Sequence, residues 1–285
     1  MTQPSLNSGV FRAEVSDEIV NERHSGCVDA RLANIMSSLV RHLHAFAKEV
    51  HLTQAEWGTA VEFLTRTGQM CSAERQEFIL LSDVLGLSML VDAINNVRPA
   101  SATENTVLGP FHVEGAPVRQ MGDTITLDGK GELCRFEGRV VDLHGNPIAG
   151  ARVDVWSDNA EGFYDVQQPD IQPKWNNRGI FVTGADGTYC FRGIKPVSYP
   201  IPSDGPVGQL LTALDRHPMR PAHMHFIVTA PGFQKLVTHT FVSGDSYLLS
   251  DAVFGVKASL IAPYKKAAEG PELWTSEFNF VLAPE

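Results

Sequence analysis

The segment Arg220 to Phe226 (RPAHMHF) carries two histidines, His223 and His225, separated by one residue. In a β-strand the side chains of residues i and i+2 point to the same face, so both imidazoles can reach one metal ion. Neutral imidazole suits iron, copper, zinc and nickel alike, so the pair predicts a metal site without naming the metal. Two half-buried structural histidines would give the same pattern.

Two tyrosines precede this pair. Tyr164 follows an expected strand, and Tyr199 begins a proline-rich segment, YPIPSDGP. A lone tyrosine in either place usually serves packing, and a phenol with a pKa of about 10 ionises at neutral pH only beside a strong Lewis acid. Two tyrosinates and two histidines together would suit a hard trivalent ion such as Fe(III). Arg220, always protonated, is the remaining cation near these residues.

These residues lie in segments that resemble one enzyme family. Segment 196–233 resembles the intradiol ring-cleaving dioxygenases, the catechol 1,2-dioxygenase family, and within it the members that act on hydroxyquinol (benzene-1,2,4-triol). The resemblance covers nearly the whole chain and includes segments 76–88, 103–114, 138–167 and 244–260. The family's four iron ligands fall on Tyr164, Tyr199, His223 and His225.

The resemblance implies a non-haem Fe(III) enzyme of aromatic catabolism. It would cleave an aromatic diol or triol with O2 between the two adjacent hydroxyl-bearing carbons, and hydroxyquinol would give 3-hydroxy-cis,cis-muconate (maleylacetate). Tyr199 is implied to leave the metal when substrate binds and to accept a substrate proton. Arg220 is implied to stabilise negative charge on the activated ring. His239 stands where catechol-cleaving relatives carry a glutamine; it could position substrate or solvent, or merely face the sheet interior.

The resemblance also predicts a substrate pocket. Asp83 could accept a hydrogen bond from a third ring hydroxyl, and such a site penalises an analogue that lacks the hydroxyl. A solvated helix residue is the alternative interpretation of Asp83. The predicted wall comprises Leu80, Asp83, Val107, Leu108, Gly109, Pro110, Phe111, Ile201, Pro202, Arg220 and Val253.

The first hundred residues predict helices that must position part of this wall. Apolar residues three and four apart over 28–48 predict an amphipathic helix. Thr53, three residues before Glu56, predicts a helix cap and a second helix to Arg66. A third helix is predicted from about Ser72 through Leu81 and onward toward Asn95, before Pro99 ends the helical region.

After Pro99 the pattern changes to short strands between turns. This pattern predicts an antiparallel β-sandwich, and the whole chain a mainly β fold with α-helices. The expected division is a helical region over 1–100 and an iron-binding catalytic domain over 101–285. The predicted strands are 134–142, 153–156, 189–191, 226–228 and 237–242.

The composition excludes several classes of protein. The chain has 285 residues, 23 basic and 33 acidic, and a net charge of −10, which argues against nucleic acid as the main partner. No apolar run approaches the ~20 residues that span a bilayer. The first ten residues lack a signal-peptide pattern, which predicts a cytoplasmic protein. The resemblance implies a homodimer through the N-terminal helices, where bound phospholipid is a recurrent family feature.

Two other functions remain open at this point. A catechol or chlorocatechol 1,2-dioxygenase would use the same residues on another ring. Segment 138–164 also resembles non-catalytic β-sandwich binding modules, which would not require Tyr199, Arg220, His223 and His225 together. An extradiol enzyme would use Fe(II) with two histidines and a carboxylate, and no carboxylate accompanies the histidine pair in a recognisable motif.

Overall fold

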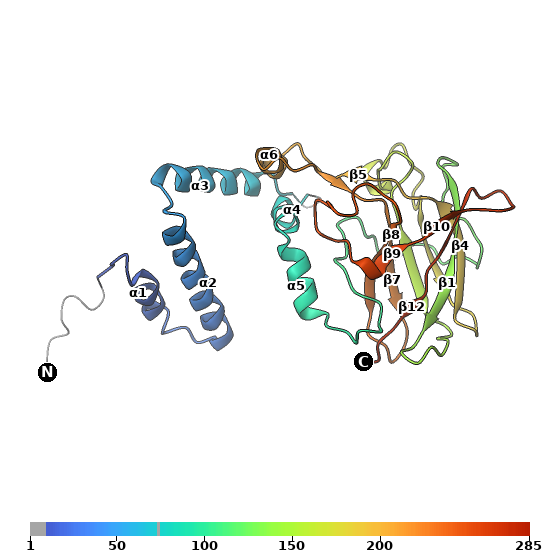
Figure 1. Ribbon diagram of the computed structural model, residues 1–285, viewed down its shortest axis with the longest axis horizontal. Coiled ribbons are helices and arrows are strands. Elements are labelled where there is room, and N and C mark those ends of the chain that lie inside the picture. The colour runs from blue at the N-terminus through green and yellow to red at the C-terminus, as the bar shows by residue number, and fades with distance from the viewer. Residues whose placement is uncertain (1–9, 73–74) are drawn as a thin grey trace. The chain divides into compact units, whose positions relative to one another are not determined.

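The computed structural model describes residues 10–72 and 75–285 (Figure 1). The chain forms two compact units, Met1–Arg66 and Thr67–Glu285. This division falls before the predicted one at residue 100, because helices α4 (Glu77–Val84) and α5 (Leu87–Asn95) belong to the second unit. No helix in the described part of the chain is both long and apolar enough to cross a membrane.

The first unit contains α1 (Ser16–Arg23), α2 (Ala30–Glu49) and most of α3 (Gln54–Gln69). The predictions of α2 and α3 are confirmed, whereas α1, which has little apolar periodicity, escaped prediction. Asp29 caps α2 by accepting hydrogen bonds from two backbone N–H groups of its first turn. At α3 the Thr53 hydroxyl accepts from the Glu56 N–H, and the Glu56 carboxylate accepts from the Thr53 N–H, as a capping box requires.

The third predicted helix is two helices in the structure. Gly86 adopts a left-handed conformation, φ 74°, between α4 and α5, so the chain turns there instead of continuing. The predicted start at Ser72 is wrong, because α4 begins at Glu77. Residues 73 and 74 of that prediction lie outside the described residues.

The second unit is built on a β-sandwich (Figure 1). One sheet contains β1 (Leu133–Val141), β4 (Thr188–Ile194), β10 (Tyr264–Lys266), β11 (Trp274–Glu277) and β12 (Phe280–Val281). The other contains β2 (Arg152–Trp156), β3 (Arg178–Val182), β7 (His223–Thr229), β8 (Leu236–Val242) and β9 (Ile261–Ala262). A small separate pair is formed by β5 (Tyr199–Pro200) and β6 (Met219–Arg220), and the remaining elements are α6 (Pro206–Ala213), η1 (Asp165–Gln167) and η2 (Ala258–Leu260).

The sheets are mixed, which corrects the purely antiparallel prediction. β11 and β12 run parallel to β1, and β9 runs parallel to β8. These pairs join strands that are distant in the chain and are not linked by tight hairpins, so local turn signals could not reveal their direction. All five predicted strands are present: β1 is shifted by one residue from the predicted 134–142, and the other four are one to four residues longer than predicted.

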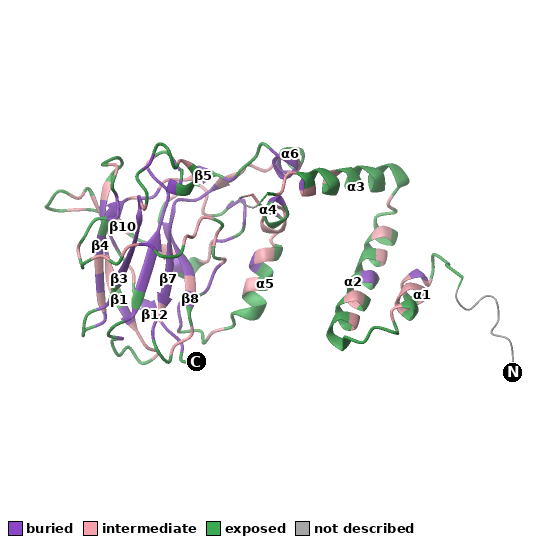
Figure 2. Cartoon of the chain, turned by 180° about the vertical axis from the view of Figure 1, so that it is seen from behind, coloured by how far each residue is buried: buried purple, intermediate pink, exposed green. Residues whose placement is uncertain are grey.

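The sandwich interior fixes strand β7. Met224, Phe226 and Val228 point into the core between the sheets, where they join side chains such as Phe136 and Phe191. Figure 2 shows β7 as one of the most continuously buried strands of the second unit. Because side chains alternate along a strand, the histidines of β7 face the opposite side, toward α4 and α5, which lie beside the β7–β8 sheet (Figure 1).

Candidate metal centre and substrate pocket

Strand β7 holds His223 and His225 with their Nε2 atoms 3.2 Å apart, and both residues are buried. The Nδ1 atom of His223 lies 2.7 Å from the carbonyl oxygen of Pro221. A carbonyl only accepts, so Nδ1 carries the proton and Nε2 presents its lone pair. The His225 ring stacks on Trp156 with centroids 4.6 Å apart. Both imidazoles are therefore held in fixed orientations, as metal ligands usually are.

The two predicted tyrosines meet at these histidines. The phenol oxygen of Tyr164 lies 2.9 Å from Nε2 of His225 and 3.3 Å from the phenol oxygen of Tyr199. Tyr164 precedes η1, where its N–H donates to Gln167, and its ring stacks on Phe111 at 4.7 Å. Tyr199 comes from β5.

A close backbone approach brings the tyrosine loops together. Gly162 has φ 82°, and a Cβ atom added there would lie 2.9 Å from Cβ of Tyr199. The glycine before Phe163 is thus needed for both conformation and space.

Burial governs the charge of this cluster. It raises the pKa of Tyr164 well above its usual value and also raises the pKa of Tyr199. It lowers the pKa of His223 and His225 well below the usual value. The protein alone therefore keeps neutral imidazoles and protonated phenols here.

The donor set fits a hard trivalent ion. Four oxygen and nitrogen donors converge in a buried space, and the His223 and His225 Nε2 atoms face each other closely. A cation between them would accept the nitrogen lone pairs that have no proton to share. It would also be the Lewis acid that the buried phenols need in order to ionise. Fe(III) with two tyrosinates and two histidines meets these conditions.

His239 extends the cluster. It pairs with His225 across β7 and β8, and the two rings lie perpendicular with centroids 4.2 Å apart. Its Nδ1 is 3.2 Å from the Thr106 hydroxyl, while its buried Nε2 has no hydrogen-bond partner among the described residues. Potential ligand atoms of His223, His225 and His239 all lie within 4.8 Å of one another. This buried nitrogen faces the cluster without a protein partner, so it is available to a ligand or solvent molecule.

Arg220 stands beside the same cluster. It pairs with Tyr199 across β5 and β6, and its Nη1 is 3.3 Å from Nε2 of His223. Burial alone would lower the pKa of Arg220, but the charge of Asp251 and its hydrogen bond act in the opposite direction, and that pKa is raised. The guanidinium is therefore a permanent positive charge in a buried site.

A cavity of about 310 Å³ adjoins Tyr199 and Arg220, within the usual range of small-molecule sites. Of the predicted wall, Leu108 does not line it and is 42% exposed. The predicted residues that do are Leu80, Asp83, Val107, Gly109, Pro110, Phe111, Ile201, Pro202, Arg220 and Val253. Asp83 therefore lines the cavity and is half-buried. Burial raises its pKa, although Ser88 and Arg220 act in the opposite direction.

Sequence reasoning missed part of the wall, namely Arg75, Gln76, Glu77 and Ile79. Glu77 is fully buried, accepts from Arg75 at 2.9 Å and accepts from the Val207 N–H at the start of α6. An acid directly before the apolar run 78–81 was the available signal. Asp251, the partner of Arg220, was also missed, because nothing near it in the sequence distinguishes it from a surface acid.

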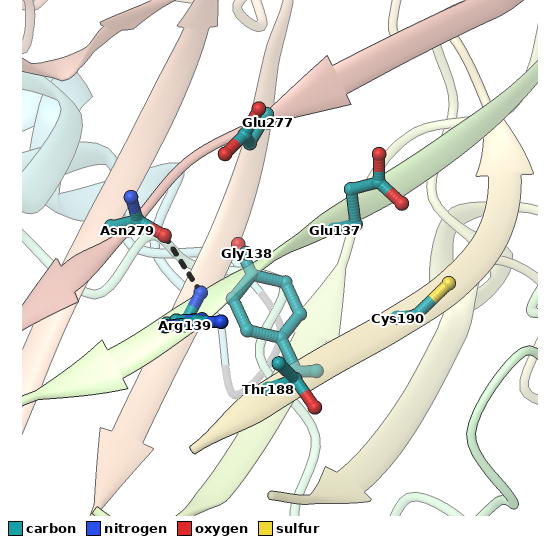
Figure 3. A pocket seen from close by; sticks show the side chains of 8 residues that line it. Glu137, Gly138, Arg139, Thr188, Cys190, Glu277 and Asn279 are labelled. Atoms are coloured by element: carbon teal, nitrogen blue, oxygen red, sulfur yellow. Dashed lines mark hydrogen bonds between the residues drawn. The ribbon is translucent and has the colours of Figure 1, made fainter. Parts of the chain in front are cut away.

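A second hollow, of about 530 Å³, is unrelated to this site (Figure 3). It lies over β1, β4 and β11 in the other sheet, and its lining includes Glu137, Arg139, Cys190 and Glu277. Its charges are of both signs, and Arg139 is held through its backbone N–H by the Asn279 side chain at 2.8 Å. None of the predicted site residues lines it.

Comparisons with known proteins agree with this geometry. The catechol dioxygenase N-terminus model matches residues 29–103, and the dioxygenase model matches residues 107–284. Hydroxyquinol 1,2-dioxygenase of Rhizobium sp. (strain MTP-10005) is 55% identical over 97% of both chains. The 6-chlorohydroxyquinol 1,2-dioxygenase of Cupriavidus pinatubonensis is 54% identical over 90% of this chain and 92% of the relative. The structure of hydroxyquinol 1,2-dioxygenase from Pseudomonas putida DLL-E4 superposes with a TM-score of 0.92 at 46% identity, covering 96% of this chain and 99% of that one.

Proposed function

Because this chain belongs to the intradiol ring-cleaving dioxygenases of the catechol dioxygenase family, we propose that it cleaves hydroxyquinol with O2 between the two adjacent hydroxyl-bearing carbons. The product is 3-hydroxy-cis,cis-muconate, the enol form of maleylacetate. The observation that carries the proposal is the convergence of two tyrosines and two histidines beside a pocket that contains Asp83. A non-catalytic sandwich module would have no use for this combination.

Tyr164, Tyr199, His223 and His225 would hold the Fe(III) ion. When bound, iron would supply the Lewis acid that ionises the substrate hydroxyls and activates the ring toward O2. Tyr199 lines the pocket whereas Tyr164 does not, which supports Tyr199 as the tyrosine that takes up a substrate proton at its phenol oxygen. His239, with its unsatisfied Nε2, would position substrate or solvent.

Charge and hydrogen bonding would orient the ring. Arg220 carries a fixed positive charge at the pocket, and it would stabilise negative charge as it develops on the ring. Asp83 would accept a hydrogen bond from the third hydroxyl of hydroxyquinol. Catechol lacks this hydroxyl and would leave the half-buried carboxylate without this hydrogen bond, so it should be the poorer substrate.

The test is a substrate panel under oxygen with identification of the products. The panel contains hydroxyquinol, 6-chlorohydroxyquinol, catechol, 4-chlorocatechol and protocatechuate. We expect the highest kcat/KM for hydroxyquinol and a product that contains both atoms of 18O2. Preference for catechol or 4-chlorocatechol would instead identify a catechol or chlorocatechol 1,2-dioxygenase, and cleavage outside the two hydroxyl-bearing carbons would overturn the intradiol assignment.

The proposal assigns different roles to the two regions of the chain. Region 1–100 would supply Leu80 and Asp83 and the dimer contact, and region 101–285 would hold the metal. We expect the protein to act in the cytoplasm.

The homodimer proposal starts from α2. Taken by itself, the first unit leaves one apolar face of this helix exposed. A second copy of the chain would cover this face, as family members do, and a phospholipid chain would lie between the two copies. Sedimentation should show twice the chain mass of 31.2 kDa, and organic extracts should contain phospholipid. The exposed apolar residues are Leu32, Ile35, Leu39, Leu43 and Phe46.

A further inference from the structure

Arg220 forms a buried ion pair with Asp251, which lies in the loop between β8 and η2. The Arg220 Nε lies 3.2 Å from Oδ1 of Asp251, and its Nη2 lies 3.5 Å from Oδ2. Both side chains are almost inaccessible, at 5% and 2% exposure. The reaction proposed above uses Arg220 but has no step for Asp251.

The contact fixes the direction of the guanidinium. Asp251 engages one edge of this planar group, Nε and Nη2, so the plane cannot rotate without breaking the pair. The remaining nitrogen, Nη1, then lies 3.3 Å from Nε2 of His223, on the side of the candidate metal centre. A free arginine side chain would have several rotamers and would not keep this one.

Asp251 also holds the pocket wall. Its Oδ1 accepts from the Val253 N–H at 3.3 Å, and its Oδ2 accepts from the Gly255 N–H at 2.8 Å. Val253 lines the cavity. A Cβ atom at Gly255 would lie 2.9 Å from Nη2 of Arg220 and 3.1 Å from Oδ2 of Asp251, so the ion pair fills all the space beside this glycine.

We propose that Asp251 is a positioning residue that orients the Arg220 guanidinium toward the substrate ring. Through its hydrogen bond to the Val253 N–H, it also couples this orientation to the position of Val253 in the pocket wall. The identity of the substrate rests on the proposed function, whereas the orientation of the Arg220 guanidinium does not. Partners that orient metal ligands typically change activity ~10- to 100-fold when removed, and we expect a loss of the same order for the partner that orients Arg220.

Asp251→Asn is the principal variant, because it removes the charge and keeps one of the two oxygens that accept from the backbone N–H groups of Val253 and Gly255. We expect kcat for hydroxyquinol to fall ~10- to 100-fold, with a smaller change in the anaerobic dissociation constant for hydroxyquinol. Iron content and the tyrosinate absorption band should stay as in the wild type. Glu272→Gln, which amidates an ion-paired carboxylate at the edge of the other sheet, should change none of these. A lower melting temperature and iron content with unchanged kcat per iron would show a structural role only and overturn the proposal.

A double-mutant cycle asks whether Asp251 acts through Arg220. In an Arg220→Ala background, Asp251→Asn should lower kcat by less than about twofold, because the group that it positions is gone. Independent, multiplying losses would contradict the proposal. Gly255→Ala leaves the charge of Asp251 in place but crowds Nη2 of Arg220, and it should lower kcat as well.

A crystal structure of Asp251→Asn decides the question without turnover. Rotation of Arg220 so that Nη1 leaves His223 supports the proposal, and an unchanged guanidinium overturns it. If the wild type cleaves none of the five panel compounds, the proposed function fails, and this structural comparison still decides the role of Asp251.

Discussion

The phenol oxygen of Tyr164 lies 2.9 Å from Nε2 of His225, although 61 residues separate them in the chain. This contact joins the loop after β2 to the strand β7. We predict that Tyr164→Phe and Tyr199→Phe each lower the iron content and weaken the visible absorption that arises from tyrosinate bound to Fe(III), because each removes one anionic donor.

Iron per chain and the visible spectrum check this prediction. Tyr247→Phe is the matched control, since its phenol lies outside the pocket lining. Full iron content with an unaltered spectrum in both site variants would show that the tyrosines are not ligands.

Asp83 should determine the preference for a third hydroxyl. In Asp83→Ala we expect the ratio of kcat/KM for hydroxyquinol to that for catechol to fall by at least ~10-fold, because the acceptor that distinguishes them is gone. Asp83→Asn keeps an oxygen acceptor and should fall less. Steady-state kinetics with both substrates provide the ratio, and an unchanged ratio would exclude Asp83 from selectivity.

His239 should be a positioning residue rather than a ligand. His239→Leu removes both ring nitrogens, and we expect kcat/KM to fall ~10- to 100-fold with iron retained. His239→Gln keeps a polar group near Thr106 and should recover most of the activity. Iron analysis separates the alternatives: loss of metal from both variants would instead make His239 part of a three-histidine metal site.

Asp158 should make the metal-free protein less stable at neutral pH. Burial raises the pKa of Asp158 well above its usual value, and the N–H groups of Asp158 and Val197 offset only part of this. The folded state therefore binds the proton more tightly than the unfolded state, and stability falls as pH rises from below the unfolded pKa of about 3.9 toward the folded value.

The measurement is thermal unfolding of metal-free wild type and Asp158→Asn across this pH range. The variant should unfold at a higher temperature near pH 7, by a few degrees, and the advantage should shrink near pH 3, where the carboxyl is protonated in both states. An Asp158→Asn variant that is less stable at neutral pH would falsify this interpretation. Asp142→Asn tests the opposite case, because hydrogen bonds from Asn146 lower the pKa of this exposed carboxyl and its amide should bring no stabilisation.

The parts of the fold that sequence could predict are those with local signals. The 3.6-residue periodicity of α2 and the cap at Thr53 sufficed for two helices. The apolar run that continues past Phe78 hid the break at Gly86, because a glycine within such a run reads as a tolerated helix residue. Helix α6 was hidden by the prolines around it, although Pro206 occupies the first helical turn, where proline is favoured.

The candidate site divides in the same way. His223 and His225 follow from their spacing alone, while the tyrosines and the pocket wall required the family resemblance, since nothing local connects Tyr164 to Tyr199. Asp251 lies 31 residues from Arg220, and only the folded chain shows that the two form a pair. The mixed sheets depend likewise on pairings between distant strands.

Strand β7 presents His223 and His225 on one side and Met224, Phe226 and Val228 on the other. The visible absorption of the iron-loaded protein should therefore depend on how well the side chains of the sandwich interior pack. We expect a core truncation such as Val228→Ala, three residues after His225, to displace the absorption maximum. Selection for core packing and selection for metal geometry would then act on the same short strand, so a substitution that changes one would also change the other.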